Sequence, residues 1–234
     1  MKVKFLEEKV IEAEAMLLLK AYEQQFDIRI VPPVPIDEIA ECNLELSLRF
    51  GNLEVRLQRK GVMGAIWMDE KKVVIDESLD PTTHPSQNGR YRFTVGHEVG
   101  HWVLHRAYYF ARSLQQDLFA ANEEPSIVCR NGDTAPIEWQ ANAFSACALM
   151  PKDLVQEAWE QRQGTSRPYN ATDEVSFLSS KWSLGEDEIP TVEIAREMAK
   201  QQFHVSAQAM QIRLVGLGLI QLSKESPALF DKWK

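Results

Sequence analysis

The sequence predicts an α+β protein, in which a small antiparallel sheet packs on a helical core and a helical region follows at the C-terminal end. Three observations lead to this class. Apolar residues recur at helical spacing near the start of the chain, they alternate with polar residues from Leu44 onwards, and helical patterns dominate again from Tyr91. This order of helix, small sheet and then mostly helix is that of an α+β arrangement.

The N-terminal part begins with a helix and continues into a strand. Apolar side chains form a stripe from about Leu6 to Phe26, which predicts the first helix. The proline-rich run 32–35 ends this helix, and residues 36–41 have the pattern of a short second one. From Leu44 to Arg49 apolar and polar residues alternate, as they do in a half-buried strand.

A hairpin and a loop follow. Residues 62–68 and 73–75 are apolar runs on either side of the charged segment 69–72, which predicts two paired strands joined by a turn. Residues 78–89 are rich in Pro, Asn and Thr and are therefore expected to form a loop.

The second half of the chain is predicted to be mainly helical. A long helix is expected over 91–110, a second over 137–150 and an amphipathic third over 152–163. Residues 111–133 show little periodicity and are interpreted as a connection. After the polar stretch 164–174 the pattern indicates further helices.

The composition and net charge of the chain make some classes of function less compatible with this sequence. The chain has 234 residues and a net charge of -8, which argues against a polyanion as its main partner. Its three cysteines are odd in number and irregularly spaced, so we expect reduced thiols rather than a disulfide framework. No stretch has the length of a membrane span or the layout of a signal peptide. We therefore expect a cytoplasmic protein with no membrane partner.

The motif that carries chemistry is His97-Glu98-Val99-Gly100-His101. Two histidines four residues apart leave a helix on nearly the same face, so both imidazoles can reach one zinc ion. Glu98 points about 100° round the helix, so it flanks the metal and can take a proton from its water. Gly100 lies inside a helix, where glycine costs roughly 0.5–1 kcal/mol relative to alanine. We therefore expect another group to approach the backbone there.

A catalytic zinc ion needs a third protein ligand, and Glu138 is the favoured candidate. It opens the helix 137–150, which can pack antiparallel to the helix of the motif. Asn142 lies one turn further on the same face and is predicted to hydrogen-bond a ligand imidazole. The alternative for Glu138 is an ordinary carboxylate at a helix N-terminus. The other candidate ligands downstream are Glu123, Glu124, Asp133, Glu157 and Glu160.

Three blocks together resemble the ImmA/IrrE family of metallo-endopeptidases. They are residues 92–101 (RFTVGHEVGH), 138–144 (EWQANAF) and 149–151 (LMP), within a resemblance that runs roughly from Ile36 to Ile220. It implies a zincin-like metallopeptidase domain over residues 1–170. It also implies zinc, or manganese or another divalent ion, bound by His97, His101 and Glu138, with Glu98 as general base. The implied partner is a protein substrate, namely a DNA-binding helix-turn-helix repressor.

Residues 171–234 are predicted to form a helical C-terminal region with a helix-turn-helix-like segment. Two helical patterns, 194–200 and 209–214, flank a short turn with a serine cap at Ser206. The charges of this segment are almost balanced, although a recognition helix needs cationic anchors and polar base readers. We therefore favour a structural or repressor-docking role over direct nucleic-acid binding. The available readers are Gln208, Gln211 and Arg213.

Two further hypotheses compete with a peptidase. One is a DNA-binding or repressor-docking regulator whose metal site is structural or sensory, and the other is an interaction protein with a vestigial site. Several other side chains have two readings. His105 is expected to be a satisfied buried histidine, and the alternative is that it stabilises a tetrahedral intermediate. His84 is expected to be a surface histidine, and the alternative is that it approaches the cleft. Cys129 is expected to be an inert thiol. The alternative is that its thiolate occupies the open position of the zinc ion and keeps the enzyme latent. The candidates for an oxyanion-stabilising hydroxyl are Tyr91, Tyr108 and Tyr109.

Overall fold

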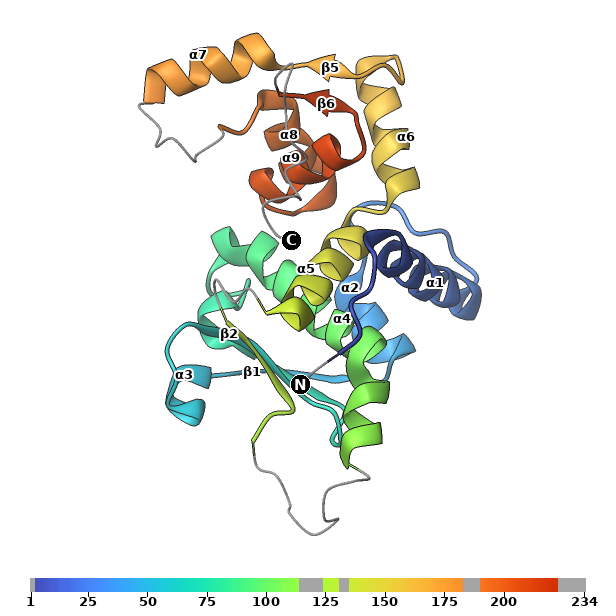
Figure 1. Cartoon of the computed structure of the whole chain (residues 1–234), viewed down its shortest axis with the longest axis vertical. Helices are drawn as coiled ribbons and strands as arrows, with labels where there is room; N and C mark the ends of the chain where they lie inside the picture. The colour runs from blue at the N-terminus through green and yellow to red at the C-terminus, as the bar shows by residue number, and fades with distance from the viewer. Residues whose placement is uncertain (1–2, 114–123, 131–134, 183–189, 223–234) are drawn as a thin grey trace. The chain divides into compact units, whose positions relative to one another are not determined.

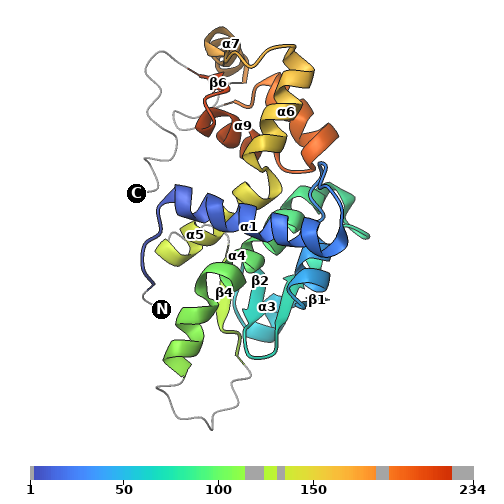
Figure 2. The same ribbon diagram turned by 90° about the vertical axis from the view of Figure 1, so that its right-hand side faces the viewer.

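Helix α4, Asn88–Ser113, is the element around which the first part of this computed structural model is built. It packs against α5, Pro136–Leu149, on one side and against the sheet on the other (Figure 1). The N-terminal helix α1, Glu8–Phe26, lies alongside α5, as Figure 2 shows. All three helices were predicted from apolar periodicity, and their presence is confirmed. Their buried apolar side chains include Ile11, Ala15, Leu18, Val95, Val99, Ala141, Phe144 and Ala148.

The structure describes residues 3–113, 124–130, 135–182 and 190–222. The chain forms two compact units, Met1–Leu149 and Met150–Lys234. The domain boundary expected at 170/171 stays a prediction, and the compact units divide earlier in the chain. The parts of the predicted connection at 114–123 and 131–134 lie outside the described residues.

The sheet of the first unit is mixed, which corrects the expected antiparallel sheet. Its strands are β1 (Ser47–Gly51), β2 (Val62–Trp67), β3 (Lys72–Asp76) and β4 (Ile127–Arg130), in the order β1-β3-β2-β4. The β2–β3 hairpin is antiparallel as predicted, whereas β1 pairs with β3 in parallel. The short helix α3, Leu53–Leu57, connects β1 to β2. Since β3 then returns into the space between them, it runs in the direction of β1.

Strand β4 lies inside the segment that was interpreted as an irregular connection. It pairs antiparallel with β2, and the register shifts between Val62 and Gly64. One extra residue on β2, Met63, is therefore opposite the Cys129–Arg130 step, which is a β-bulge. With only four residues, β4 has too little alternation for its sequence to reveal it.

Short helical turns complete the first unit. Helix α2, Ile36–Glu38, continues directly into a π-helical turn, η1, Ile39–Asn43, where one short helix was predicted. The expected loop over 78–89 contains two 3-10 turns, η2 (Glu77–Leu79) and η3 (Pro85–Gln87). On the sheet, a buried cluster of Leu53, Val62, Ala65, Trp67 and Val74 packs beneath α3.

The second unit is helical apart from one short pair of strands. Helix α6 covers Lys152–Gln163, as predicted. The remaining elements are β5 (Tyr169–Asn170), α7 (Thr172–Trp182), α8 (Glu193–Met198), η4 (Ala199–Phe203, π-helical), α9 (Ala207–Gly216) and β6 (Ile220–Gln221).

Within this second unit, β5 and β6 pair in parallel. The side chain of Ser206 accepts a hydrogen bond from Ala209 N at 3.1 Å and caps α9. The capped pair α8 and α9 matches the predicted helices, and its assignment as a helix-turn-helix stays a prediction. Among the described residues, no helix is both long and apolar enough to cross a membrane.

Candidate metal centre

Two histidines of α4, His97 and His101, lie one helical turn apart and face the same way. Their Nε2 atoms are 2.9 Å apart, and their rings meet nearly edge to face at 79°. Both side chains are buried, because α5 and the sheet cover this part of α4. The spacing of four residues thus brings two imidazole nitrogens to one buried point.

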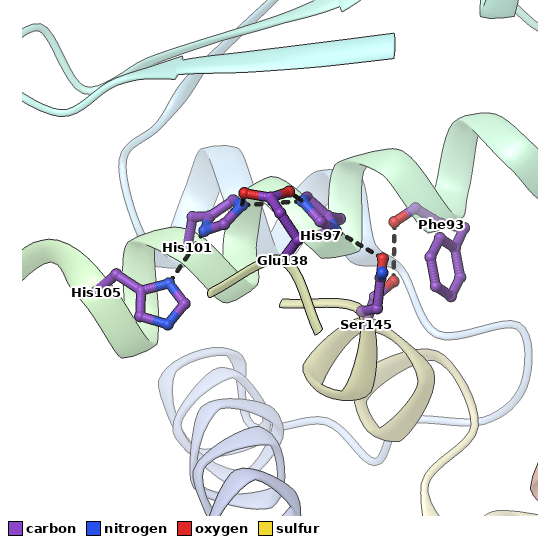
Figure 3. A network of polar contacts seen from close by, with 7 residues as sticks. Phe93, His97, His101, His105, Glu138 and Ser145 are labelled. Carbon is purple, nitrogen blue, oxygen red and sulfur yellow. Dashed lines mark hydrogen bonds and ion pairs between the residues drawn. The ribbon is translucent and has the colours of Figure 1, made fainter. Parts of the chain in front are cut away.

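The first turn of α5 adds a carboxylate to this point. Glu138 Oε2 lies 3.0 Å from His97 Nε2, and Glu138 Oε1 lies 3.4 Å from His101 Nε2 (Figure 3). The glutamate is 4% exposed. The structure therefore brings together the three residues that the sequence analysis expected to meet, and their role as metal ligands stays a prediction.

Two glycines allow α4 and α5 to approach closely enough for this meeting. A methyl group at Gly100 would lie 3.1 Å from Phe144 Cβ and 3.2 Å from the backbone of Ala141. A methyl group at Gly96 would lie 2.6 Å from the hydroxyl of Ser145. The expectation that another group approaches the backbone at Gly100 is confirmed, and that group is α5.

The three converging residues, His97, His101 and Glu138, fit a divalent metal ion. Ligand atoms about 2.0–2.1 Å from one zinc ion lie about 3.3 Å from each other in a tetrahedral arrangement. The observed separations of 2.9, 3.0 and 3.4 Å are close to that value. A carboxylate and two imidazoles are a common donor set for zinc and are also acceptable to manganese.

The Nδ1 atom of each of these two histidines, on the side of the ring away from the converging Nε2 atoms, contacts another side chain. His97 Nδ1 lies 2.9 Å from Asn142 Oδ1. Because the amide oxygen only accepts hydrogen bonds, His97 Nδ1 carries a proton, so the neutral form of this ring that binds a metal would have its lone pair on Nε2. Asn142, the predicted partner of a ligand imidazole, is thus in contact with His97.

A longer chain of hydrogen bonds holds His101. Gln140 Nε2 donates to Lys4 O at 3.1 Å, so Gln140 Oε1 is left to accept from His105 Nε2 at 3.3 Å. Burial lowers the pKa of His105 and keeps this ring neutral. His105 Nδ1 then accepts from His101 Nδ1 at 3.0 Å, and the lone pair of His101 lies on Nε2. His105 is a satisfied buried histidine, as expected.

Glu98 is fully buried, and neither of its carboxylate oxygens has a hydrogen-bond partner among the described residues. It fits where it does because Gly64 of β2 has no side chain. A methyl group at Gly64 would lie 2.6 Å from Glu98 Oε1. Burial raises the pKa of Glu98 to about 8, although the charge of His97 opposes this shift. A buried, unpaired carboxylate is costly without a cation or a bound polar group beside it.

The charges of the cluster favour a cation at its centre. Burial acts to raise the pKa of Glu138, but the adjacent imidazoles of His101 and His97 outweigh it and lower the pKa. Burial and the charge of His97 lower the pKa of His101. Glu138 is therefore ionised and His101 neutral, which are the forms in which both bind metal.

Residues 73–215 match the family model of the IrrE N-terminal-like domain, Peptidase_M78. The chain belongs to the Peptidase_M78 family. The matched range begins at β3 and ends in α9, so it contains both helices of the metal centre. A comparison with curated proteins gave no match. Membership in a peptidase family, together with the buried His-His-Glu group, supports a metallopeptidase.

The tyrosines considered for oxyanion stabilisation contact other parts of this Peptidase_M78 chain. The rings of Tyr91 and Phe50 are in tilted contact with centroids 5.5 Å apart, and Tyr109 donates to Asp69 Oδ2 at 2.6 Å. Tyr108 is exposed. These contacts do not assign an oxyanion-stabilising role to any of the three.

Neither His84 nor any lesser ligand candidate that the structure describes belongs to a group of converging donors. His84 is exposed and lines an open pocket of about 810 Å³ that none of the five predicted site residues lines. Among the lesser ligand candidates, Glu124 is exposed, and Glu157 and Glu160 belong to α6. Glu123 and Asp133 lie outside the described residues.

Sequence reasoning missed two residues that shape the site of this peptidase-family chain. Gln140 supports His105, and Gly64 provides the space for Glu98. A glycine inside a predicted strand often marks a close approach, so Gly64 carried a usable signal. Gln140 carried none, because a polar residue near the start of a helix is ordinarily solvated.

Proposed function

We propose that this chain is a zinc-dependent endopeptidase in which His97, His101 and Glu138 hold the metal. The observation that carries the proposal is the convergence of these three buried donors beside Glu98, whose carboxylate has no hydrogen-bond partner among the described residues. A structural zinc site is normally closed by four protein ligands, whereas a catalytic site has three and an open position. Three converging donors with an adjacent free carboxylate fit the catalytic type.

In the proposed hydrolysis of a peptide bond, the metal and Glu98 have different roles. A bound divalent ion polarises the scissile carbonyl and lowers the pKa of a water molecule. Glu98 accepts a proton from the attacking water and then donates it to the leaving amine. A carboxyl group whose pKa lies near the working pH can do both, and burial raises the pKa of Glu98 towards that range. Asn142 and His105 hold the two imidazoles in the orientation that presents Nε2.

The substrate we propose is a DNA-binding helix-turn-helix repressor, cleaved in the cytoplasm. Support comes from the resemblance to the ImmA/IrrE metallo-endopeptidases and from membership in the Peptidase_M78 family. The direct test combines metal analysis of the purified protein with a cleavage assay on a repressor encoded by a neighbouring gene. Zinc, with manganese as the alternative, is expected at one ion per chain.

A second candidate function is a DNA-binding or repressor-docking regulator with a structural or sensory metal site. The capped pair α8 and α9 favours it, but two of the three possible base readers are buried. Gln211 Oε1 accepts from Val192 N at 2.7 Å, and Arg213 Nε donates to Met150 O at 3.0 Å. Since both side chains are engaged inside the second unit, we favour repressor docking over DNA contact for this segment. Salt-dependent duplex binding without peptidase activity would support the regulator.

Glu98→Gln tests the role of Glu98 in the proposed peptidase. The amide has nearly the same shape as the carboxylate but cannot accept the proton, so cleavage should fall by about 10²–10⁴-fold. Metal content should stay at the wild-type value, because Glu98 does not belong to the converging His-His-Glu group. Equal cleavage by metal-loaded E98Q and wild type would remove Glu98 from the mechanism.

A further inference from the structure

Strand β4 places a cysteine over the metal centre. Cys129 pairs directly with Gly64 of β2. Residues directly opposite each other in an antiparallel pair project to the same face of the sheet. A side chain at Gly64 would run into Glu98 and Thr94 of α4. The side chain of Cys129 therefore projects towards α4 as well.

The donor atoms confirm this direction. Cys129 Sγ, a carboxylate oxygen of Glu98 and a ring nitrogen of His97 all lie within 4.8 Å of one another. His97 also belongs to the group with His101 and Glu138. Two sets of donors thus share one histidine, and the sulfur lies on the side of the cluster where Glu98 is found.

The surroundings of Cys129 distinguish it from the other two cysteines. Cys42 is exposed on the turn η1, and Cys147 is buried in α5; neither belongs to a group of converging donors among the described residues. The β-bulge at Met63 lies directly beside the Cys129–Gly64 pair. Bulges are enriched next to active sites, where they redirect side chains. Glu98, buried and without a hydrogen-bond partner among the described residues, adjoins the sulfur.

Thiolate sulfur is a preferred zinc ligand, and a fourth protein ligand closes the open position of a catalytic site. We propose that Cys129 is a fourth, exchangeable metal ligand, which gives the chain a resting state closed by sulfur. This inference rests on the metal site of the proposed function. When the metal–sulfur bond forms, the S–H bond breaks and its proton leaves to solvent. Exchange of the thiolate for water reopens the site for Glu98 to act.

Strand β4 is suited to such an exchange. Among the described strands it lies at the edge of the sheet and pairs with β2 alone. Withdrawal of Cys129 from the metal therefore disturbs one ladder and leaves the β1-β3-β2 pairing intact.

The test is the absorption spectrum of the full-length protein loaded with Co²⁺ in place of zinc. Thiolate bound to Co²⁺ gives a ligand-to-metal charge-transfer band in the near ultraviolet, which nitrogen and oxygen ligands do not give. We expect this band in wild type and its loss in Cys129→Ser. The matched controls Cys42→Ser and Cys147→Ala should keep it. Metal content is measured on each sample.

The outcomes separate this inference from the proposed function. Two results would overturn the sulfur ligand and leave the peptidase proposal standing. One is wild-type protein that binds stoichiometric Co²⁺ but lacks the charge-transfer band. The other is C129S protein that binds stoichiometric Co²⁺ and keeps the band. Absence of bound metal in wild type overturns the metal site itself. An independent check is alkylation by iodoacetamide, followed residue by residue by mass spectrometry. Zinc should protect Cys129 and leave Cys42 as reactive as in metal-free protein; equal alkylation of Cys129 with and without zinc contradicts the proposal.

Discussion

The two histidines that face Glu138 are oriented by partners of very different exposure. His101 depends on His105, which is buried and linked through Gln140 to the backbone of Lys4. His97 depends on Asn142, which is exposed to solvent. Water can replace an exposed partner but cannot reach a buried one. The two contacts are therefore expected to differ in importance, although both fix a ring in the same way.

This difference gives a prediction for metal affinity. His105→Phe removes the acceptor for His101 Nδ1 and should weaken metal binding by about 10–100-fold, the usual effect of losing a partner of a ligand histidine. Asn142→Ala should cost less, because water can accept the hydrogen bond from His97 Nδ1. Competition with a chromophoric chelator measures both affinities.

The exposed His84 supplies the control, since His84→Ala should bind metal like wild type. A conservative His105→Gln variant, which keeps an acceptor near His101, should recover part of the loss. If H105F binds metal as tightly as wild type, the buried chain through Gln140 does not orient His101.

At the residue scale, the sequence predicted the centre of the site better than its supports. The spacing of His97 and His101 and the resemblance of the block at Glu138 were sufficient, because a helix fixes which side chains share a face. Gln140 could not be predicted, because its partners His105 and Lys4 are brought to it by tertiary packing alone. Cys129 was considered, but only the pairing of β4 shows how close it lies.

At the scale of elements, the site depends on how closely α4 and α5 approach. Gly96 and Gly100 lie on the face of α4 that meets α5. Ser145 fills the space at Gly96 and donates to Phe93 O at 2.8 Å, which ties the two helices together. Ser145 thus has a structural role between these two helices.

The contact at Gly96 can be tested by paired substitutions. Gly96→Ala places a methyl group 2.6 Å from the Ser145 hydroxyl, and such overpacking costs about 1–3 kcal/mol of unfolding free energy. Combining it with Ser145→Ala removes the clashing oxygen and leaves a Cβ contact of 3.3 Å. The double variant should therefore recover most of the loss. Urea denaturation followed by circular dichroism measures each free energy of unfolding.

Ser145→Ala alone is the control for this comparison. It loses one hydrogen bond, which contributes about 0.5–1.5 kcal/mol. Additive losses in the double variant would mean that Gly96 and Ser145 are not in contact in solution.

The helices could be predicted from the sequence, whereas the order of the strands could not. Apolar periodicity locates a helix by its own residues, so α1, α4, α5 and α6 were found with small errors at their ends. Alternation predicted a strand at 44–49, where β1 covers Ser47–Gly51, but it does not show which strand pairs with this segment. The parallel β1–β3 pair and the edge strand β4 depend on how the chain returns, which is tertiary information.

For the molecule as a whole, every residue of the metal centre belongs to the first of the two units. His97, His101, Glu138 and Cys129 all lie within Met1–Leu149. Buried side chains of the second unit, such as Gln211 and Arg213, are satisfied by its own backbone. A metal ion should therefore stabilise the first unit directly.

Metal removal should lower the stability of the folded protein by an amount set by mass action. At a free metal concentration of 100 Kd, a ligand that binds only the folded state adds about 2.7 kcal/mol. For a protein of this size that corresponds to a shift of roughly 5–10 °C in the unfolding temperature. Differential scanning calorimetry with and without a chelator measures the shift. Glu138→Gln should abolish most of it, because the amide cannot supply a carboxylate to the metal.

The exposed carboxylate Glu160 of α6, one of the lesser candidate ligands, provides the matched control. Glu160→Gln should keep the full wild-type shift in unfolding temperature, and an equal shift in E138Q would exclude Glu138 as a ligand.

Hydrogen exchange then shows which helices the metal stabilises. Metal should slow exchange in α4 and α5, whose side chains it joins, and leave α8 and α9 unchanged, because those helices contribute no donor to the converging groups among the described residues. Equal protection of α8 and α9 would show that the metal stabilises both units as one.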